Sequence, residues 1–112
     1  MTFEVENRSG ATIVRLSGDL TGRDEGKLVK AVAEMLDREG AKIVVDLAEV
    51  SVVSSAGLGD LVRLAAQANS QDGRFILANL TPFVADVIRN TQLNKFFDLA
   101  EDVDTALAQL GS

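Results

Sequence analysis

A run of apolar and mostly β-branched residues near the middle of the chain constrains the fold more than any other feature. It reads AKIVVDL from Ala41 to Leu47 and lacks the strict alternation of apolar and polar positions that marks a strand with one face in water. Such a run is typical of a strand buried on both faces of a mostly parallel sheet. Amphipathic helices are predicted on either side of it, from about Arg23 to Glu39 and from about Ala56 to Ser70, because apolar residues recur there at helical spacing.

Two further strand-like runs open the chain, from Thr2 to Asn7 and from Ala11 to Ser17, and the short turn between them predicts an antiparallel hairpin. Strands that alternate with helices pair in parallel through right-handed crossovers. Residues 1–112 are therefore predicted to form one α/β domain, a mostly parallel mixed β-sheet with an N-terminal antiparallel strand and about four helices. The elements predicted after the second helix are a short strand from Arg74 to Ala78, a helix with Pro82 in its first turn, a short apolar segment from Lys95 to Leu99 and a closing helix from Asp102 to Leu110.

The residue types that the chain lacks exclude several kinds of site. Without cysteine or histidine it cannot form disulfides, thiol nucleophiles, Cys/His zinc sites, phosphohistidine or imidazole bases. A formal net charge of −6, with no visible stripe of lysine or arginine, opposes binding to nucleic acid or to anionic membranes. What remains for catalysis is serine or threonine with lysine, or carboxylates with or without a hard metal ion. We expect a protein that binds partners, with no enzymatic activity, no cofactor and no metal site.

The N-terminal sequence MTFEVE has no basic stretch followed by an apolar one, so no signal peptide is expected. The apolar runs of the chain are too short to cross a bilayer. These features predict a cytoplasmic protein without direct membrane insertion. The negative charge suits a soluble monomer or a weak dimer.

The turn between the buried strand and the second helix, from Val53 to Gly59, contains an informative group of small residues. A serine at such a junction can accept a hydrogen bond from an unpaired amide of the first helical turn. Gly57 and Gly59 lie inside that turn, where a glycine costs about 1 kcal/mol relative to alanine. They indicate a backbone that something must approach closely, and the free amides with the positive end of the helix dipole suit a phosphate. The alternative is an ordinary N-cap whose small residues allow tight packing of the helix on the sheet.

Three motifs resemble the STAS domain found in bacterial anti-sigma-factor antagonists, and together they extend over nearly the whole chain. DLAEVSVVSSAGL, from Asp46 to Leu58, is similar to the family's hallmark, in which a strand ending in Asp-Leu leads to a loop and to Asp-Ser-Ser/Thr-Gly-Leu at a helix start. VRLSGDL, from Val14 to Leu20, is similar to its second strand and the turn that follows. FILANLTPFVADVIRNTQLNKFFDL, from Phe75 to Leu99, is similar to its last strands and third helix. The resemblance implies a single STAS-like domain.

The resemblance also implies a function, that of an anti-sigma-factor antagonist that binds an anti-sigma factor and so releases a sigma factor. The anti-sigma factor is also a serine kinase of the GHKL type, which switches the antagonist off by phosphorylating it at the start of the second helix, and a PP2C-type phosphatase reverses the step. Ala56 occupies the usual acceptor position, Ser54 that of the usual aspartate, and Thr21 a position where antagonists often have another aspartate. Ser55 is therefore the implied phosphorylation site, with Ser54 as the alternative. The implied partner-binding residues are Asp19, Thr21, Ser54, Ser55, Ala56, Gly57 and Leu58.

Other functions stay open at this point. A STAS domain can also serve as an accessory subunit of a lipid transporter or in a stressosome-type signalling scaffold. Two classes of function are disfavoured. A response-regulator receiver needs paired acids after its first strand, where this chain has Arg8-Ser9-Gly10. A serine hydrolase needs a base near Ser55, and the chain has no histidine and no lysine nearby in the sequence. Phe83 and Val84 offer a second candidate for partner binding, as an exposed apolar patch.

Carboxylates near the second loop could hold a divalent ion, and Asp19, Asp24 and Glu25 are the candidates. Asp24 and Glu25 are more simply explained by the preference for acids in the first turn of a helix. Asp46 is expected to cap loop amides rather than to bind a metal.

Overall fold

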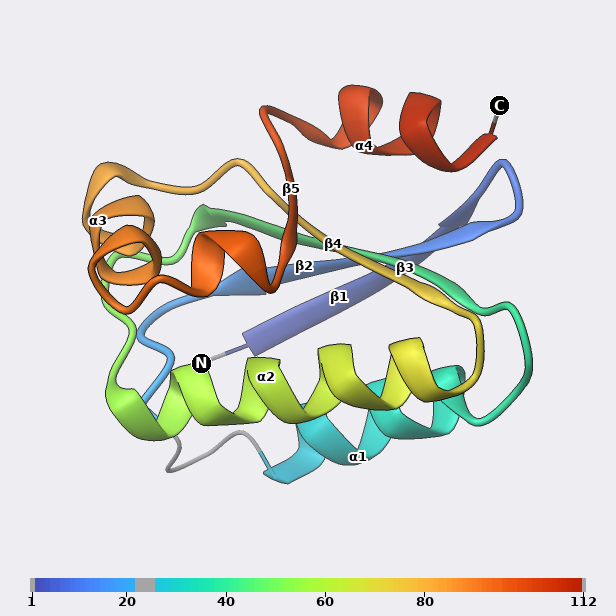
Figure 1. The fold of residues 1–112 in the computed structure, drawn as a ribbon, viewed down its shortest axis with the longest axis horizontal. Helices are drawn as coiled ribbons and strands as arrows, with labels where there is room; N and C mark the ends of the chain where they lie inside the picture. The colour runs from blue at the N-terminus through green and yellow to red at the C-terminus, as the bar shows by residue number, and fades with distance from the viewer. Residues whose placement is uncertain (1, 22–25, 112) are drawn as a thin grey trace.

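The computed structural model describes residues 2–21 and 26–111, which form a five-stranded mixed sheet with helices on both faces (Figure 1). The strands lie in the order β1-β2-β3-β4-β5; β1 runs antiparallel to β2, and the other neighbouring pairs are parallel. This topology confirms the predicted fold class and the antiparallel N-terminal strand. The elements are β1 (Thr2–Arg8), β2 (Ala11–Ser17), α1 (Gly26–Leu36), β3 (Lys42–Glu49), α2 (Ser55–Ser70), β4 (Arg74–Ala78), α3 (Pro82–Asn90), the 3-10 turn η1 (Leu93–Lys95), β5 (Asp98–Ala100) and α4 (Val103–Gly111).

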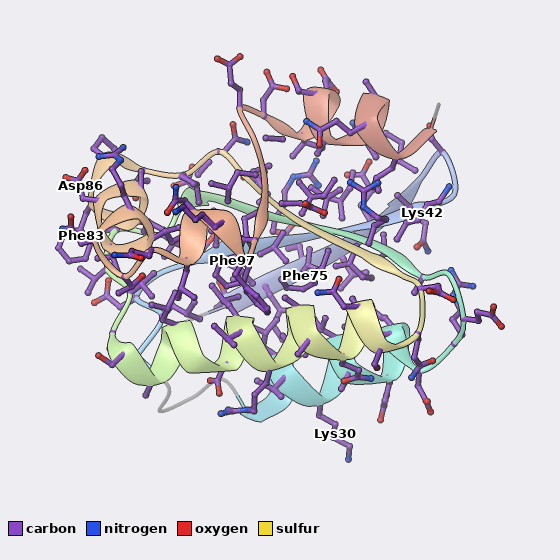
Figure 2. The ribbon with its side chains drawn as sticks, viewed as in Figure 1. Lys30, Lys42, Phe75, Phe83, Asp86 and Phe97 are labelled. Atoms are coloured by element: carbon purple, nitrogen blue, oxygen red, sulfur yellow. The ribbon has the colours of Figure 1, made fainter. Side chains whose placement is uncertain are left out.

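The central strand β3 is buried on both faces, as its apolar run predicts. Val45 and Leu47 belong to the core that the sheet shares with α1 and α2, whereas Val44 belongs to the smaller core beneath α4. Figure 2 shows Phe75 and Phe97 in the first of these cores, between the sheet and α2. Successive residues of β3 therefore pack against different helices. No helix among residues 2–21 and 26–111 is long and apolar enough to cross a membrane.

The first predicted helix is longer than the one observed. α1 ends at Leu36 rather than Glu39, and the amide of Asp37 donates to the carbonyl of Glu34 at 3.2 Å. This tighter, three-residue pattern is typical of a helix end. The predicted start at Arg23 lies outside the described residues.

The apolar segment from Lys95 to Leu99 runs from the end of the 3-10 turn η1 to the start of the last strand, β5. η1 closes a tight turn in which the amide of Phe97 donates to the carbonyl of Leu93 at 2.9 Å, and β5 begins only after it. The turn buries Phe97 and leaves Phe96 exposed. The break between η1 and β5 therefore arises because one aromatic ring enters the core while its neighbour faces solvent.

The loops after β2, β3 and β4 meet at the edge of the sheet where these parallel strands end. The amide of Gly18 donates to the carbonyl of Glu49 at 3.1 Å, which joins the loop after β2 to the end of β3. The hydroxyl of Thr81 donates to the carbonyl of Val50 at 2.8 Å, which joins the third loop to the second. In open α/β sheets this edge is where binding sites are generally built.

Candidate functional site

The predicted turn forms the start of α2, and Ser54 caps that helix. The Oγ of Ser54 accepts a hydrogen bond from the amide of Gly57 at 3.2 Å, and its backbone is extended, with φ −87° and ψ 170°. The carbonyl of Ser54 accepts a bond from the amide of Leu58 at 2.8 Å. The N-cap interpretation of the turn is therefore confirmed, and α2 begins at Ser55, one residue earlier than predicted.

The same hydroxyl ties α2 to the loop after β2. Ser54 donates its Oγ–H to the carbonyl of Thr21 at 2.8 Å. Beside this bond, the amide of Leu20 donates to the carbonyl of Val52 at 2.8 Å, and the amide of Ser54 donates to the carbonyl of Leu20 at 2.9 Å. Leu20 also forms a short parallel bridge with Val53. The hydroxyl of Ser54 therefore donates one hydrogen bond and accepts another, and these bonds hold two loops and a helix together.

Gly57 is approached closely by the chain itself rather than by a separate molecule. A Cβ added to Gly57 would lie 2.2 Å from the carbonyl oxygen of Leu20. At Gly59 the nearest atom to an added Cβ is Nη1 of Arg63, at 3.9 Å, which is ordinary contact. The two glycines therefore have different roles: Gly57 makes room for the backbone of the neighbouring loop, and Gly59 leaves a side-chain-free strip on the surface of α2.

The residues implied as partner-binding separate into exposed and buried groups. Asp19, Ser55 and Ala56 are exposed, Thr21 and Ser54 are half-buried, and Gly57 and Leu58 are buried. Ser55 is the first residue of α2, and its hydroxyl makes no hydrogen bond to the described part of the chain. Of the two adjacent serines, the structure therefore leaves Ser55 accessible and uses Ser54 internally.

Ser54→Ala is expected to lower the free energy of unfolding by about 1–3 kcal/mol, because it removes both the helix cap and the bond to the Thr21 carbonyl. Ser55→Ala is the matched control and should change it by less than about 0.5 kcal/mol, as expected for an exposed site without such contacts. Urea denaturation followed by circular dichroism measures both values, since the chain has no tryptophan or tyrosine as a fluorescence probe. Equal losses in the two variants would contradict the structural role of Ser54.

Two exposed apolar side chains lie at the same edge, one on a loop and one at the start of α3. Val52, in the loop before α2, is 41% exposed, and Phe83, in the first turn of α3, is 50% exposed. The Thr81–Val50 hydrogen bond links the segments that carry them. Phe83 fits the predicted apolar patch, whereas Val84 is fully buried and does not belong to it. Sequence reasoning missed Val52, since its neighbours Val50 and Val53 are buried and no periodicity separates it from them.

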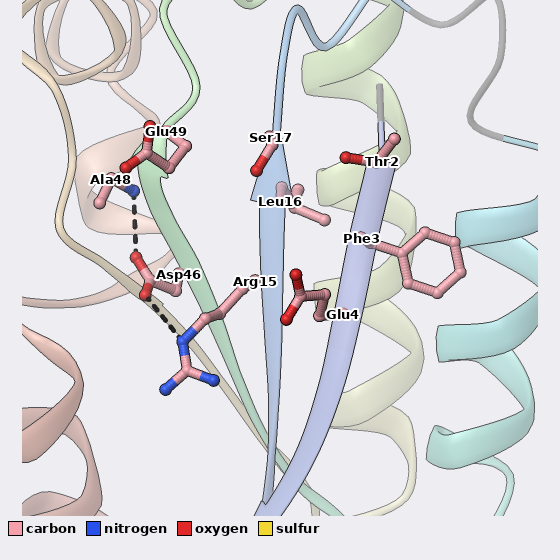
Figure 3. Close-up of a pocket in the computed structure, with 9 residues that line it drawn as sticks. All are labelled: Thr2, Phe3, Glu4, Arg15, Leu16, Ser17, Asp46, Ala48 and Glu49. Carbon is pink, nitrogen blue, oxygen red and sulfur yellow. Dashed lines mark hydrogen bonds and ion pairs between the residues drawn. The ribbon is translucent and has the colours of Figure 1, made fainter.

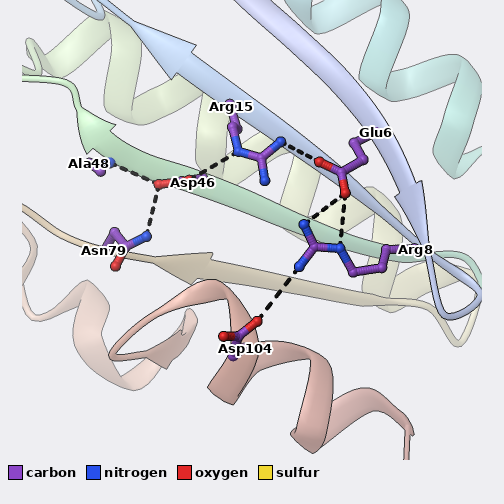
Figure 4. A network of polar contacts seen from close by, with 7 residues as sticks. All are labelled: Glu6, Arg8, Arg15, Asp46, Ala48, Asn79 and Asp104. Atoms are coloured by element: carbon purple, nitrogen blue, oxygen red, sulfur yellow. Dashed lines mark hydrogen bonds and ion pairs between the residues drawn. The ribbon is translucent and has the colours of Figure 1, made fainter.

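On the face of the sheet that α4 covers, Arg15 of β2 is the centre of a polar network (Figure 4). Its Nη1 donates to Oε1 of Glu6 at 2.5 Å, and its Nε lies 3.6 Å from Oδ2 of Asp46. Oδ1 of Asp46 accepts bonds from the amide of Ala48 at 3.0 Å and from Nδ2 of Asn79 at 3.1 Å. Asp46 therefore caps an amide near the end of its own strand, since β3 runs to Glu49, and not the loop amide that was predicted.

A cavity of about 310 Å³ adjoins this network, and Glu4, Arg15 and Asp46 are among the residues that line it (Figure 3). Hydrogen bonds from Arg15 and Arg8 hold the pKa of the Glu6 carboxyl below its usual value. Arg15 is thus already engaged by two carboxylates, Glu6 and Asp46.

Within residues 2–21 and 26–111, acidic side chains do not gather into a group of three or more that could hold a metal ion. Asp19 is exposed at the surface of the loop after β2. Asp24 and Glu25, the other members of the considered carboxylate cluster, lie outside the described residues.

Several named proteins are similar to the chain over almost its whole length. A family model described as the STAS domain matches residues 2–106. A Bordetella bronchiseptica protein named as an anti-sigma factor antagonist, BtrV, is 26% identical over 108 residues, which cover 96% of this chain and 93% of that protein. The crystal structure of an anti-sigma factor antagonist from Mycobacterium paratuberculosis has a TM-score of 0.87 and 26% identity, covering 99% of this chain and 94% of that one. The Bacillus cell fate determinant SpoIIAA in its phosphorylated form shares the fold, with a TM-score of 0.75, 19% identity, and coverage of 97% and 99%.

Proposed function

Because the chain belongs to the STAS domain family, we propose that it is a cytoplasmic anti-sigma factor antagonist, which binds an anti-sigma factor and thereby releases a sigma factor. Relatives named as antagonists match it over almost its full length, which supports this function. The proposed docking surface is the exposed part of the edge where β2, β3 and β4 end: Asp19, Val52, Ser55, Ala56 and Phe83.

We propose that phosphorylation of Ser55 switches this surface off. It is exposed at the first position of α2, and its hydroxyl is not engaged by the described residues. Ser54 is a poor acceptor by contrast, since its Oγ donates to the carbonyl of Thr21 and accepts from the amide of Gly57. A kinase would have to break both bonds to reach it. Ser55 is therefore our proposed acceptor, although Ala56 occupies the position usual in the family.

The proposed reaction is phosphoryl transfer from ATP, catalysed by the anti-sigma factor acting as a serine kinase of the GHKL type. A bond forms between Oγ of Ser55 and the γ-phosphorus, the bond from that phosphorus to the β–γ bridging oxygen breaks, and ADP leaves. The hydroxyl proton passes to a base on the kinase. A PP2C-type phosphatase then hydrolyses the phosphoserine and restores the hydroxyl.

Phosphorylation would change the docking surface without disturbing the fold. It adds about −1.5 to −2 charges and three acceptor oxygens at an exposed position. Burying that charge against a partner costs several kcal/mol unless new pairs form. The phosphate would stand at the positive end of the α2 dipole and outside the core, so the domain itself stays folded.

Release of a sigma factor tests the proposed function. An anti-sigma factor from the same organism is loaded with its sigma factor, the purified chain is added, and free sigma factor is measured by size-exclusion chromatography. We expect the chain to displace the sigma factor. Failure to displace it, together with copurification of a transporter ATPase, would instead support the role of accessory subunit in a lipid transporter.

A further inference from the structure

Ser55, Gly59 and Arg63 lie on one side of α2 at intervals of four residues. Side chains on a helix tilt toward its N-terminus, so the Arg63 side chain extends from its own turn toward Ser55. Gly59 stands between these two residues in this row and carries no side chain. The side chain of the intervening residue therefore does not separate the guanidinium from the start of the helix.

The two terminal nitrogens of Arg63 occupy different places. Nη2 donates to Oδ1 of Asp60, whose side chain is only 13% exposed and so holds that end of the guanidinium. Nη1 lies over Gly59, 3.9 Å from where its Cβ would be, and makes no hydrogen bond to the described residues. One end of the guanidinium fork is thus anchored, and the other points along the helix with donors to spare.

We propose that Arg63 is the residue that binds the phosphate of phosphorylated Ser55, with Asp60 as its positioning residue. The proposal rests on Ser55 as the modified serine. Nη1 donates to a phosphate oxygen while Nη2 keeps its bond to Asp60, so the pairing needs no exchange of partners. Arginine binds phosphate through short, charge-assisted hydrogen bonds. The phosphate is then held along α2 at the docking surface, where it blocks a partner, instead of moving freely in solvent.

The test installs phosphoserine at position 55 by genetic encoding, so that no kinase is needed, and titrates its phosphate by ³¹P NMR. Arg63→Gln is expected to raise the midpoint of the second phosphate ionisation by about 0.3–0.7 of a pH unit at low salt, the effect of an exposed ion pair. The increase should shrink in 0.5 M salt because the pair is screened. A variant with a long side chain at the intervening position, Gly59→Gln, should raise the midpoint as well.

Arg89→Gln is the matched control. Arg89 pairs with Asp86 in the same three-residue spacing on α3, at 2.9 Å, and is 67% exposed against 68% for Arg63. It should leave the phosphate midpoint unchanged. Identical midpoints in Arg63→Gln, Arg89→Gln and the parent would overturn the assignment of Arg63. That result would not contradict the proposal that the kinase phosphorylates Ser55. Conversely, phosphorylation of another serine by the kinase would not contradict a pairing of Arg63 with phosphoserine 55 that the titration has measured.

Discussion

Gly57→Ala is expected to destabilise the protein by roughly 3 kcal/mol, at the upper end of the usual cost of overpacking. The added Cβ would lie 2.2 Å from the carbonyl oxygen of Leu20, and 2.8 Å from its carbonyl carbon, so a backbone segment has to move. That movement strains two hydrogen bonds that join the same two loops. In one, the amide of Ser54 donates to the carbonyl of Leu20, and in the other, the hydroxyl of Ser54 donates to the carbonyl of Thr21. The loss is measured by urea denaturation under the conditions used for Ser54→Ala.

Gly59→Ala provides the control two residues further along α2. An alanine there meets only the end of the flexible Arg63 side chain, at 3.9 Å, and removes the helix penalty of a glycine. This variant should gain up to about 1 kcal/mol. The two glycine-to-alanine changes are thus expected to differ in sign. Similar effects from both would show that the Leu20 carbonyl does not determine the residue at position 57.

Phosphorylation of Ser55 is expected to weaken binding to the anti-sigma factor at least ~100-fold, which corresponds to about 2.7 kcal/mol. The cause is the cost of burying a phosphate dianion against the partner, a cost that a single exposed arginine, Arg63, offsets only in part. Stability should stay within about 1 kcal/mol of the unmodified protein, and a rise is expected from the helix dipole. Calorimetric titration of the two forms with the anti-sigma factor measures the difference.

Ser55→Ala separates docking from its switch. It keeps a small side chain at the start of α2 and removes the acceptor oxygen, so it should bind the anti-sigma factor as the unmodified protein does. Incubation with kinase and ATP should then leave its affinity unchanged. Equal affinity of the modified and unmodified proteins would contradict a switch at this position.

The fold could be predicted from local patterns because each main element carries its own periodicity. The run from Ala41 to Leu47 identified a doubly buried strand, and β3 packs Val44 and Val45 into different cores. The turn η1 and the start of β5 could not be located within the segment from Lys95 to Leu99, because they depend on the burial of Phe97, a tertiary contact that no local pattern records. Propensity is a weak guide wherever packing decides.

The sequence predicted where in the chain the site lies, but it did not predict which atoms of the site contact each other. The glycines of the turn showed that something approaches the backbone, but only the structure shows that it is the carbonyl of Leu20. The preference for Ser55 over Ser54 as the proposed phosphorylation site depends on the hydrogen bond from Ser54 to Thr21, 33 residues earlier in the chain. A sequence motif shows which hydroxyls are near each other along the chain and not which of them is already bonded.

Mapping of the phosphate by mass spectrometry, after incubation with the anti-sigma kinase and ATP, tests the central claim most directly. We expect one phosphate per chain, on Ser55, in the wild-type protein, and none on Ser55→Ala. Ala56→Ser, which restores the family's usual acceptor, should also accept phosphate and serves as a control for kinase activity. A phosphate on Ser54 or elsewhere in the wild-type protein, or an unmodified wild type beside a phosphorylated Ala56→Ser, would contradict it.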